Sequence, residues 1–115
     1  MKNILYVDDE EMNLMLFKTM FSKSCKVNTA SNGQTALDLL TKIDKPEVVI
    51  SDMKMPGMDG LEFISKASEV YPDIEYYILS GYEISQRVRE ALNSGLVKKY
   101  FQKPFRKREL EAILN

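Results

Sequence analysis

The sequence predicts an α/β fold, with a doubly wound, five-stranded parallel sheet and helices on both of its faces. Short apolar runs rich in β-branched residues are typical of strands that are buried on both faces of a parallel sheet. In this chain such runs alternate with stretches of helical periodicity, which is the pattern of a parallel α/β protein. The length of 115 residues suits one domain with a real core.

The first half of the chain supplies two strands and two helices. The first strand is the compact apolar run Ile4–Val7, and an acidic segment ends it. The apolar residues that follow recur at helical spacing and predict a helix at about 11–22. A weakly alternating strand comes next, at about 26–30. A helix then begins near Gly33 and extends to about Ile43, because its apolar residues stand at i, i+1, i+4 and i+7.

The chain is organised around the stretch 48–60. Its β-branched start predicts a strand, and that strand ends at a lone carboxylate, Asp52. A turn built on proline and glycine follows. Asp59, with Glu62 three residues later, has the pattern of a helix N-cap with a capping box. In open α/β sheets ligands bind at the carboxyl ends of the strands, so an acid at this position is better placed for chemistry than for solubility.

The second half continues the alternation of helices and strands. A helix at about 60–70 precedes a fourth strand at about 74–79. Apolar residues from Ile84 onward mark a fourth helix, with Gly95 at its end. A short strand at 99–102 and a last helix complete the chain. Right-handed crossovers restrict the winding of such a sheet, and the flavodoxin-like order 2-1-3-4-5 is the common solution at this size.

Composition excludes several classes of function. The net charge is −1, so the overall charge does not point to nucleic acid. Without histidine the chain cannot hold a histidine-based triad, a histidine metal site or a phosphohistidine carrier. No apolar run approaches the ~20 residues of a membrane span, and the N-terminus does not have the pattern of a signal peptide. The single Cys25 suits a reducing compartment and a buried site at a strand start, so we expect a cytoplasmic protein.

Polar side chains gather at the C-terminal tips of the predicted strands. Strand one ends at Asp8 and Asp9, strand three at Asp52 and strand four at Ser80, and Lys103 follows strand five. Carboxylates from neighbouring strands form a hard oxygen site that suits Mg²⁺. With Mg²⁺ and the Lys103 ammonium nearby, Asp52 would stay ionised and nucleophilic, and such carboxylates form aspartyl-phosphates. Ser80 and the backbone N–H groups after Asp52 would donate to the phosphoryl oxygens.

These motifs resemble, over the whole chain, the receiver domain of two-component response regulators. The matching segments are Ile4-Leu5-Tyr6-Val7-Asp8-Asp9-Glu10, Asp52 with Met55-Pro56-Gly57-Met58-Asp59-Gly60, Leu79-Ser80-Gly81 and Lys103-Pro104-Phe105. The resemblance implies a single receiver domain at residues 1–115, and no output domain is visible in this chain. It implies a phosphorylatable signalling switch, not an enzyme in the usual sense, although it catalyses its own phosphoryl transfer and slow aspartyl-phosphate hydrolysis.

The resemblance also implies a role for each site residue. Asp52 accepts a phosphoryl group from a phosphohistidine of a sensor histidine kinase or a histidine phosphotransfer protein. Mg²⁺ is held by Asp9, Asp52 and the backbone carbonyl of Lys54, while Asp8 acts mainly through water.

Three further implied roles concern the switch itself. Ser80, in place of the commoner Thr, and Lys103 contact the phosphoryl group. Tyr100 is the switch aromatic, which turns inward when Ser80 moves toward the phosphate. The peptide bond before Pro104 is expected to be cis, otherwise a minority state of roughly 5–6% for X–Pro bonds in folded proteins.

The expected output surface comprises the fourth helix, the fifth strand and the last helix, at about 82–115. Phosphorylation would alter this surface to control an unknown downstream protein or to form a homodimer, without direct binding of nucleic acid or membrane. A basic cluster there would favour an acidic partner, since charge complementarity sets specificity more than affinity. Its residues are Lys98, Lys99, Lys103, Arg106, Lys107 and Arg108.

Two residues are expected to tune the lifetime of the phosphorylated state. In this family the residues two past the acceptor and two past the switch hydroxyl border the path of the hydrolytic water. Here they are Lys54 and Tyr82. An ammonium cannot accept a hydrogen bond from that water, and a tyrosine is bulky, so we expect slow hydrolysis. The alternative is that both side chains point away and the chemistry ignores them.

Other functions remain as alternatives. One is a receiver-like scaffold that binds partners without phosphorylation. Another is a Mg²⁺-dependent phosphatase with an aspartate nucleophile, although such enzymes usually need a second acid at the position of Lys54. A flavin-binding protein is disfavoured, because the acidic loop after strand one would repel the phosphate of the cofactor.

Overall fold

The computed structural model describes residues 2–114 and shows a five-stranded, all-parallel sheet in the order β2-β1-β3-β4-β5. Its strands are β1 (Lys2–Val7), β2 (Cys25–Ala30), β3 (Val48–Ser51), β4 (Glu75–Ser80) and β5 (Lys99–Gln102). Its helices are α1 (Glu11–Phe21), α2 (Gly33–Leu40), α3 (Gly60–Val70), α4 (Gln86–Ser94) and α5 (Lys107–Leu114). The predicted doubly wound fold and strand order are therefore confirmed.

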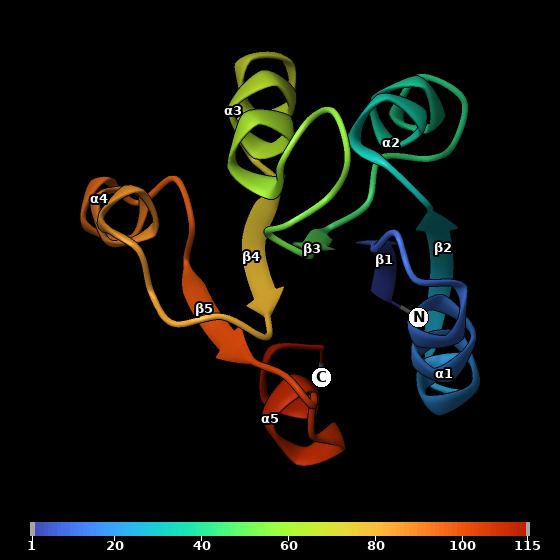
Figure 1. Cartoon of the computed structure of the whole chain (residues 1–115). Coiled ribbons are helices and arrows are strands. Elements are labelled where there is room, and N and C mark those ends of the chain that lie inside the picture. The colour runs from blue at the N-terminus through green and yellow to red at the C-terminus, as the bar shows by residue number, and fades with distance from the viewer. Residues whose placement is uncertain (1, 115) are drawn as a thin grey trace.

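The sheet separates two apolar layers, because successive side chains of a strand point to opposite faces. Figure 1 shows α2, α3 and α4 on one side of the sheet and α1 and α5 on the other. Leu5 and Val7 of β1 belong to the first layer. Ile4 and Tyr6 of the same strand belong to the second, together with Phe17 of α1. The central strands are thus buried from both sides, as their continuous apolar sequences predict.

The predicted boundaries of most elements lie within one or two residues of those in the structure. The fourth helix begins two residues after Ile84, at Gln86. Ile84 lies before α4, because the Ser85 side chain accepts a hydrogen bond from the Val88 N–H and caps the helix there. The α2 helix also ends earlier than the apolar pattern indicates, at Leu40 and not near Ile43. Within residues 2–114 no helix has both the length and the apolar character to cross a membrane.

The start of α3 fixes the loop that follows Asp52. Asp59 is the N-cap, and its side chain and that of Glu62 form the predicted capping box. Gly60 begins the helix against the backbone of the preceding loop, with its N–H donating to the Met53 carbonyl at 2.8 Å. A Cβ atom at Gly60 would overlap the carbonyl oxygen of Asp52 and reach 3.0 Å from the Cα of Met53. The close approach of this helix to the site therefore requires glycine.

We predict that Gly60→Ala lowers the free energy of unfolding by about 2 kcal/mol or more, since the atoms in the way are backbone atoms. Gly81→Ala is the matched control, because a Cβ there meets nothing within 4 Å. We expect the control to change stability by less than about 1 kcal/mol. Urea unfolding of both variants measures the difference, and equal stabilities would contradict the close-approach argument.

Candidate functional site

The carboxyl ends of four strands bring the predicted polar residues together at one end of the sheet. Asp8 and Asp52 are buried, whereas Asp9 is exposed. One carboxylate oxygen from each of these three residues lies within 4.8 Å of the other two. The remaining members, Ser80 at the end of β4 and Lys103 after β5, come from the neighbouring strands.

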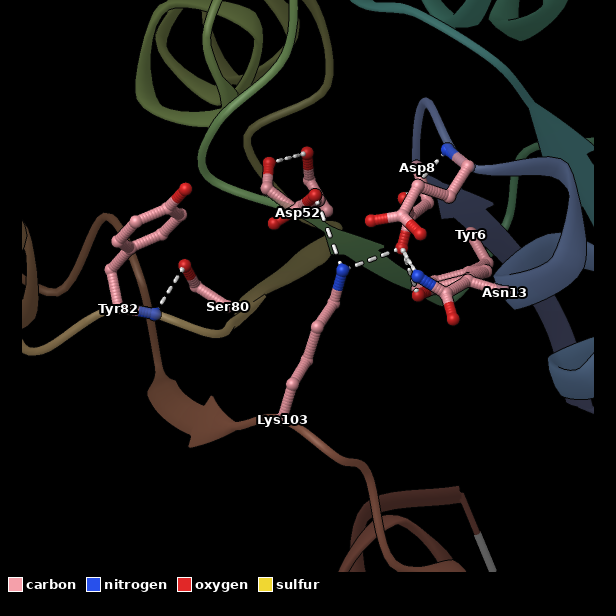
Figure 2. A network of polar contacts seen from close by, with 9 residues as sticks. Tyr6, Asp8, Asn13, Asp52, Ser80, Tyr82 and Lys103 are labelled. Atoms are coloured by element: carbon pink, nitrogen blue, oxygen red, sulfur yellow. Dashed lines mark hydrogen bonds and ion pairs between the residues drawn. The ribbon is translucent and has the colours of Figure 1, made fainter.

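Lys103 joins the two buried carboxylates. Its ammonium lies 2.9 Å from Oδ2 of Asp8 and 3.2 Å from Oδ2 of Asp52, and Figure 2 shows its side chain reaching up between them. Burial works to lower the pKa of Lys103. The hydrogen bonds and charges of the two carboxylates outweigh burial and hold this pKa above its ordinary value. The ammonium therefore stays charged where it can meet an anionic group.

Asp52 lies at the end of β3, and its backbone N–H continues the sheet by donating to the Val7 carbonyl at 2.8 Å. Burial is the largest influence on its carboxyl group and raises the pKa. Lys103 opposes this effect and the charge of Asp8 adds to it, so the pKa of Asp52 stands above its ordinary value. A cation near this carboxylate would favour the ionised, nucleophilic form.

Asp8 is held by residues that the sequence analysis missed. The Tyr6 hydroxyl donates to Oδ2 of Asp8 at 2.6 Å, and Nδ2 of Asn13 donates to the same oxygen at 3.2 Å. The backbone N–H of Glu10 donates to Oδ1 at 3.0 Å. Tyr6 stands two residues before Asp8, on the same face of the strand, and this spacing was the available signal. No comparable signal pointed to Asn13.

The wall of the site opposite Asp8 comes from the loops after β3 and β4. Ser80 is buried, and its hydroxyl oxygen accepts a hydrogen bond from the Tyr82 N–H at 3.3 Å. Nζ of Lys54 lies 4.7 Å from the centroid of the Tyr82 ring, in a cation–π contact. The two side chains border an open cleft of about 810 Å³ that Asp9, Asp52 and Lys103 also line. The structure thus places both residues at the mouth of the site.

Two other predicted residues lie on β5 and just after it. Tyr100 packs against the layer formed with α2, α3 and α4, and its buried hydroxyl has no hydrogen-bond partner within residues 2–114. The Lys103–Pro104 peptide bond is cis. The predicted basic residues near β5 lie at both ends of this strand. Lys98 and Lys99 stand at the start of the strand, Arg106 and its neighbours follow its other end, and Lys103 points into the site.

The carboxylate cluster fits a divalent cation. Two oxygens bound to one Mg²⁺ at ~2.1 Å are at most about 4.2 Å apart, so oxygens within 4.8 Å need only a small closure or a bridging water. Three carboxylates and one ammonium leave the cluster with two uncompensated negative charges, which a divalent ion would balance. Asp9 is the most accessible of the three acids to such an ion.

Known proteins with similar sequences and structures support this interpretation. The family model of the response regulator receiver domain matches residues 4–115. Sporulation initiation phosphotransferase F of Bacillus subtilis is 34% identical over 105 residues, which cover 90% of this chain and 83% of that protein. The uncharacterized transcriptional regulatory protein YesN of the same organism is 35% identical, and the match covers 99% of this chain but 32% of YesN.

The solved structures agree with the sequence matches. Response regulator protein TrrA from Thermotoga maritima, solved in complex with Mg²⁺-BeF, has 32% sequence identity and a TM-score of 0.82, over 98% of this chain and 96% of that one. The fold, the acidic cluster and the sequence matches therefore lead to one conclusion. The chain belongs to the family of response regulator receiver domains, the signalling domains of two-component systems.

Proposed function

We propose that this domain is a phosphorylatable switch in which Asp52 accepts a phosphoryl group from a phosphohistidine of a sensor histidine kinase or a histidine phosphotransfer protein. The observation that carries the proposal is the Lys103 ammonium, which lies between the carboxylates of Asp8 and Asp52 at the edge of an open cleft. This arrangement supports a nucleophilic carboxylate with a positive charge already in place for a phosphoryl group.

In the proposed step an oxygen of Asp52 attacks the phosphorus, and the phosphorus–nitrogen bond of the donor breaks. The bonding electron pair leaves with the imidazole of the donor. The ammonium of Lys103 and the hydroxyl of Ser80 donate to the phosphoryl oxygens as charge shifts toward the leaving group. Asp9, Asp52 and the Lys54 carbonyl would hold Mg²⁺, with Asp8 acting through water, and the ion would offset the phosphoryl charge.

Movement of Ser80 would couple this chemistry to the output surface. Its hydroxyl bonds to the Tyr82 N–H in the present structure, so a turn toward a phosphoryl group on Asp52 breaks that contact. Ser80 is also paired in register with Gln102 of β5. Tyr100 stands two residues before Gln102, and its buried hydroxyl has no hydrogen-bond partner among residues 2–114, so a change of position that gives it one would be favourable. We infer that the surface of α4, β5 and α5 changes and controls a partner.

The alternatives make different demands on the site. A scaffold without phosphorylation needs neither the buried acids nor Lys103, and retaining them is costly for stability. An aspartyl phosphatase needs an acid at the position of Lys54, whose ammonium instead lies over the Tyr82 ring. The switch is the function that uses Asp9, Asp52, Lys54, Tyr82 and Lys103, which all line the cleft.

The acceptor is tested by labelling with a small donor. Incubation with acetyl phosphate and Mg²⁺ should add one phosphoryl group to the parent and none to Asp52→Asn, because an amide is not nucleophilic here. Asp73→Asn is the matched control, since Asp73 also pairs with a lysine but lies on the surface. Intact-mass spectrometry measures the labelling. Equal labelling of the parent and Asp52→Asn would contradict the assignment of Asp52 as the acceptor. An unlabelled parent would favour the scaffold without phosphorylation.

The output surface is tested by a phosphate mimic. Addition of beryllofluoride and Mg²⁺ should shift the backbone amide resonances of Tyr100 and of residues in α4 as well as those around Asp52. Amides of α2 serve as the internal control, because this helix packs beside β1 and β2 and away from β5. Two-dimensional NMR spectra record the shifts. Changes confined to the surroundings of Asp52 would contradict the proposed relay.

The lifetime of the phosphorylated state is tested at the mouth of the cleft. Replacing Lys54 by Asn and Tyr82 by Glu should speed loss of the phosphoryl group about tenfold, equivalent to roughly 1.4 kcal/mol of barrier. The change removes a charge that crowds the water and supplies groups that can accept its hydrogen bond. Lys99→Asn is the control, because it breaks a cation–π pair of the same kind, with Phe101, outside the cleft. Loss of the phosphoryl group after removal of the donor measures the rates. An unchanged or slower rate in the double variant would contradict the proposed effect of Lys54 and Tyr82 on the hydrolytic water.

A further inference from the structure

The Asp8 carboxylate is engaged unequally by the protein. Its Oδ2 atom accepts three hydrogen bonds, from the Tyr6 hydroxyl at 2.6 Å, Lys103 Nζ at 2.9 Å and Asn13 Nδ2 at 3.2 Å. Its Oδ1 atom accepts one, from the backbone N–H of Glu10 at 3.0 Å. The lone pairs of Oδ2 are thus occupied, and Oδ1 is the atom with acceptor capacity left for a cation or for water bound to a cation.

Tyr6 is the most rigidly placed of the three donors to Oδ2. Its side chain is fully buried, and its ring stacks on Phe17 with a centroid distance of 4.3 Å and an interplanar angle of 14°. The ring of Phe105 meets it edge-on at 6.2 Å and 77°. Lys103 and Asn13 reach the same oxygen on more flexible or more exposed side chains. The packed ring therefore holds the Tyr6 hydroxyl in one place, against Oδ2 of the Asp8 carboxylate.

We propose that Tyr6 is a positioning residue of the phosphorylation site, which acts through Asp8. Its hydroxyl fixes Oδ2 and thereby leaves Oδ1 as the oxygen with acceptor capacity for a cation bound by the cluster with Asp9 and Asp52. Because Oδ2 also accepts a hydrogen bond from Tyr6, Lys103 is not its sole donor. The ammonium therefore stays within reach of Asp52. The proposal rests on the proposed function, since it assigns a residue behind the cation site of that switch.

A purely structural role for the hydroxyl makes a different prediction. A buried carboxylate needs donors, and the Tyr6 hydroxyl would contribute stability simply by satisfying one lone pair of Asp8. That role changes the free energy of unfolding and leaves the folded site equally able to bind a cation. Positioning instead changes cation affinity in the folded protein, and only while Asp8 is a carboxylate. The affinity for Mg²⁺ alone, without any phosphoryl donor, separates the two roles.

The test is the Mg²⁺ affinity of Tyr6→Phe, which keeps the ring and removes only the hydroxyl. We expect the dissociation constant measured by titration calorimetry to rise about tenfold, at the lower end of what losing a residue behind a metal ligand costs. Tyr77→Phe is the matched control, because the Tyr77 hydroxyl also donates to a carboxylate, Glu75, at 3.2 Å and its ring lies in the same layer. The control should bind Mg²⁺ like the parent. Unchanged or tighter binding by Tyr6→Phe would overturn the proposal.

A double-mutant cycle shows whether Tyr6 acts through Asp8. In an Asp8→Asn background, Tyr6→Phe should cause no further loss of Mg²⁺ affinity, and an undiminished loss would overturn the proposal. If Tyr6→Phe does not fold, Tyr6→Leu takes its place, since it also removes the hydroxyl donor to Oδ2 and keeps an apolar side chain at this buried position. A weaker affinity in this variant supports the assignment, and an unchanged one overturns it. A parent that fails to bind Mg²⁺ contradicts the proposed function itself.

Discussion

One ammonium shared by two buried carboxylates is the interaction on which the rest of the structure depends. Without Lys103, Asp8 and Asp52 would face each other as like charges in a poorly solvated place, and the pKa of Asp52, which burial already raises, would rise further. With it, the site still has two uncompensated negative charges when Asp9 is included. The site therefore carries net negative charge, which would favour the binding of a divalent cation.

The fold makes this arrangement possible, because it brings together side chains from segments that are far apart in the chain. Lys103 and Asp8 are 95 positions apart, and only a parallel sheet in the observed order places the ends of β1, β3 and β5 so that one side chain spans them. The loop after Asp52 is kept close by Gly60, which admits the start of α3 against the Asp52 carbonyl. Local backbone constraints and long-range topology thus both determine the surroundings of Asp52.

The sequence alone predicted those features that depend on periodicity and on the direction of strands. Because parallel strands end at one edge, naming the residues after each strand was enough to assemble Asp8, Asp52 and Lys103 as a set. The sequence was less informative where a single side chain determines the boundary of an element. Ser85 ends the loop before α4 through one hydrogen bond, so the apolar Ile84 was wrongly included in the helix.

Tyr6 was missed for a related reason: its ring has the pattern of a core aromatic in a buried strand, and its spacing from Asp8 does not by itself show where the hydroxyl points. The site has a buried floor, at Tyr6 and Asp8, and a solvent-exposed mouth, at Lys54 and Tyr82. At the floor, Tyr6 is locked between aromatic rings and touches a carboxylate. At the mouth, Lys54 and Tyr82 meet through a contact that is open to solvent. A rigid floor suits the setting of cation affinity, and an exposed mouth suits the control of water. We therefore expect side-chain substitutions in the two places to affect different properties of the proposed switch, cation affinity for Tyr6 and hydrolysis for Lys54 and Tyr82.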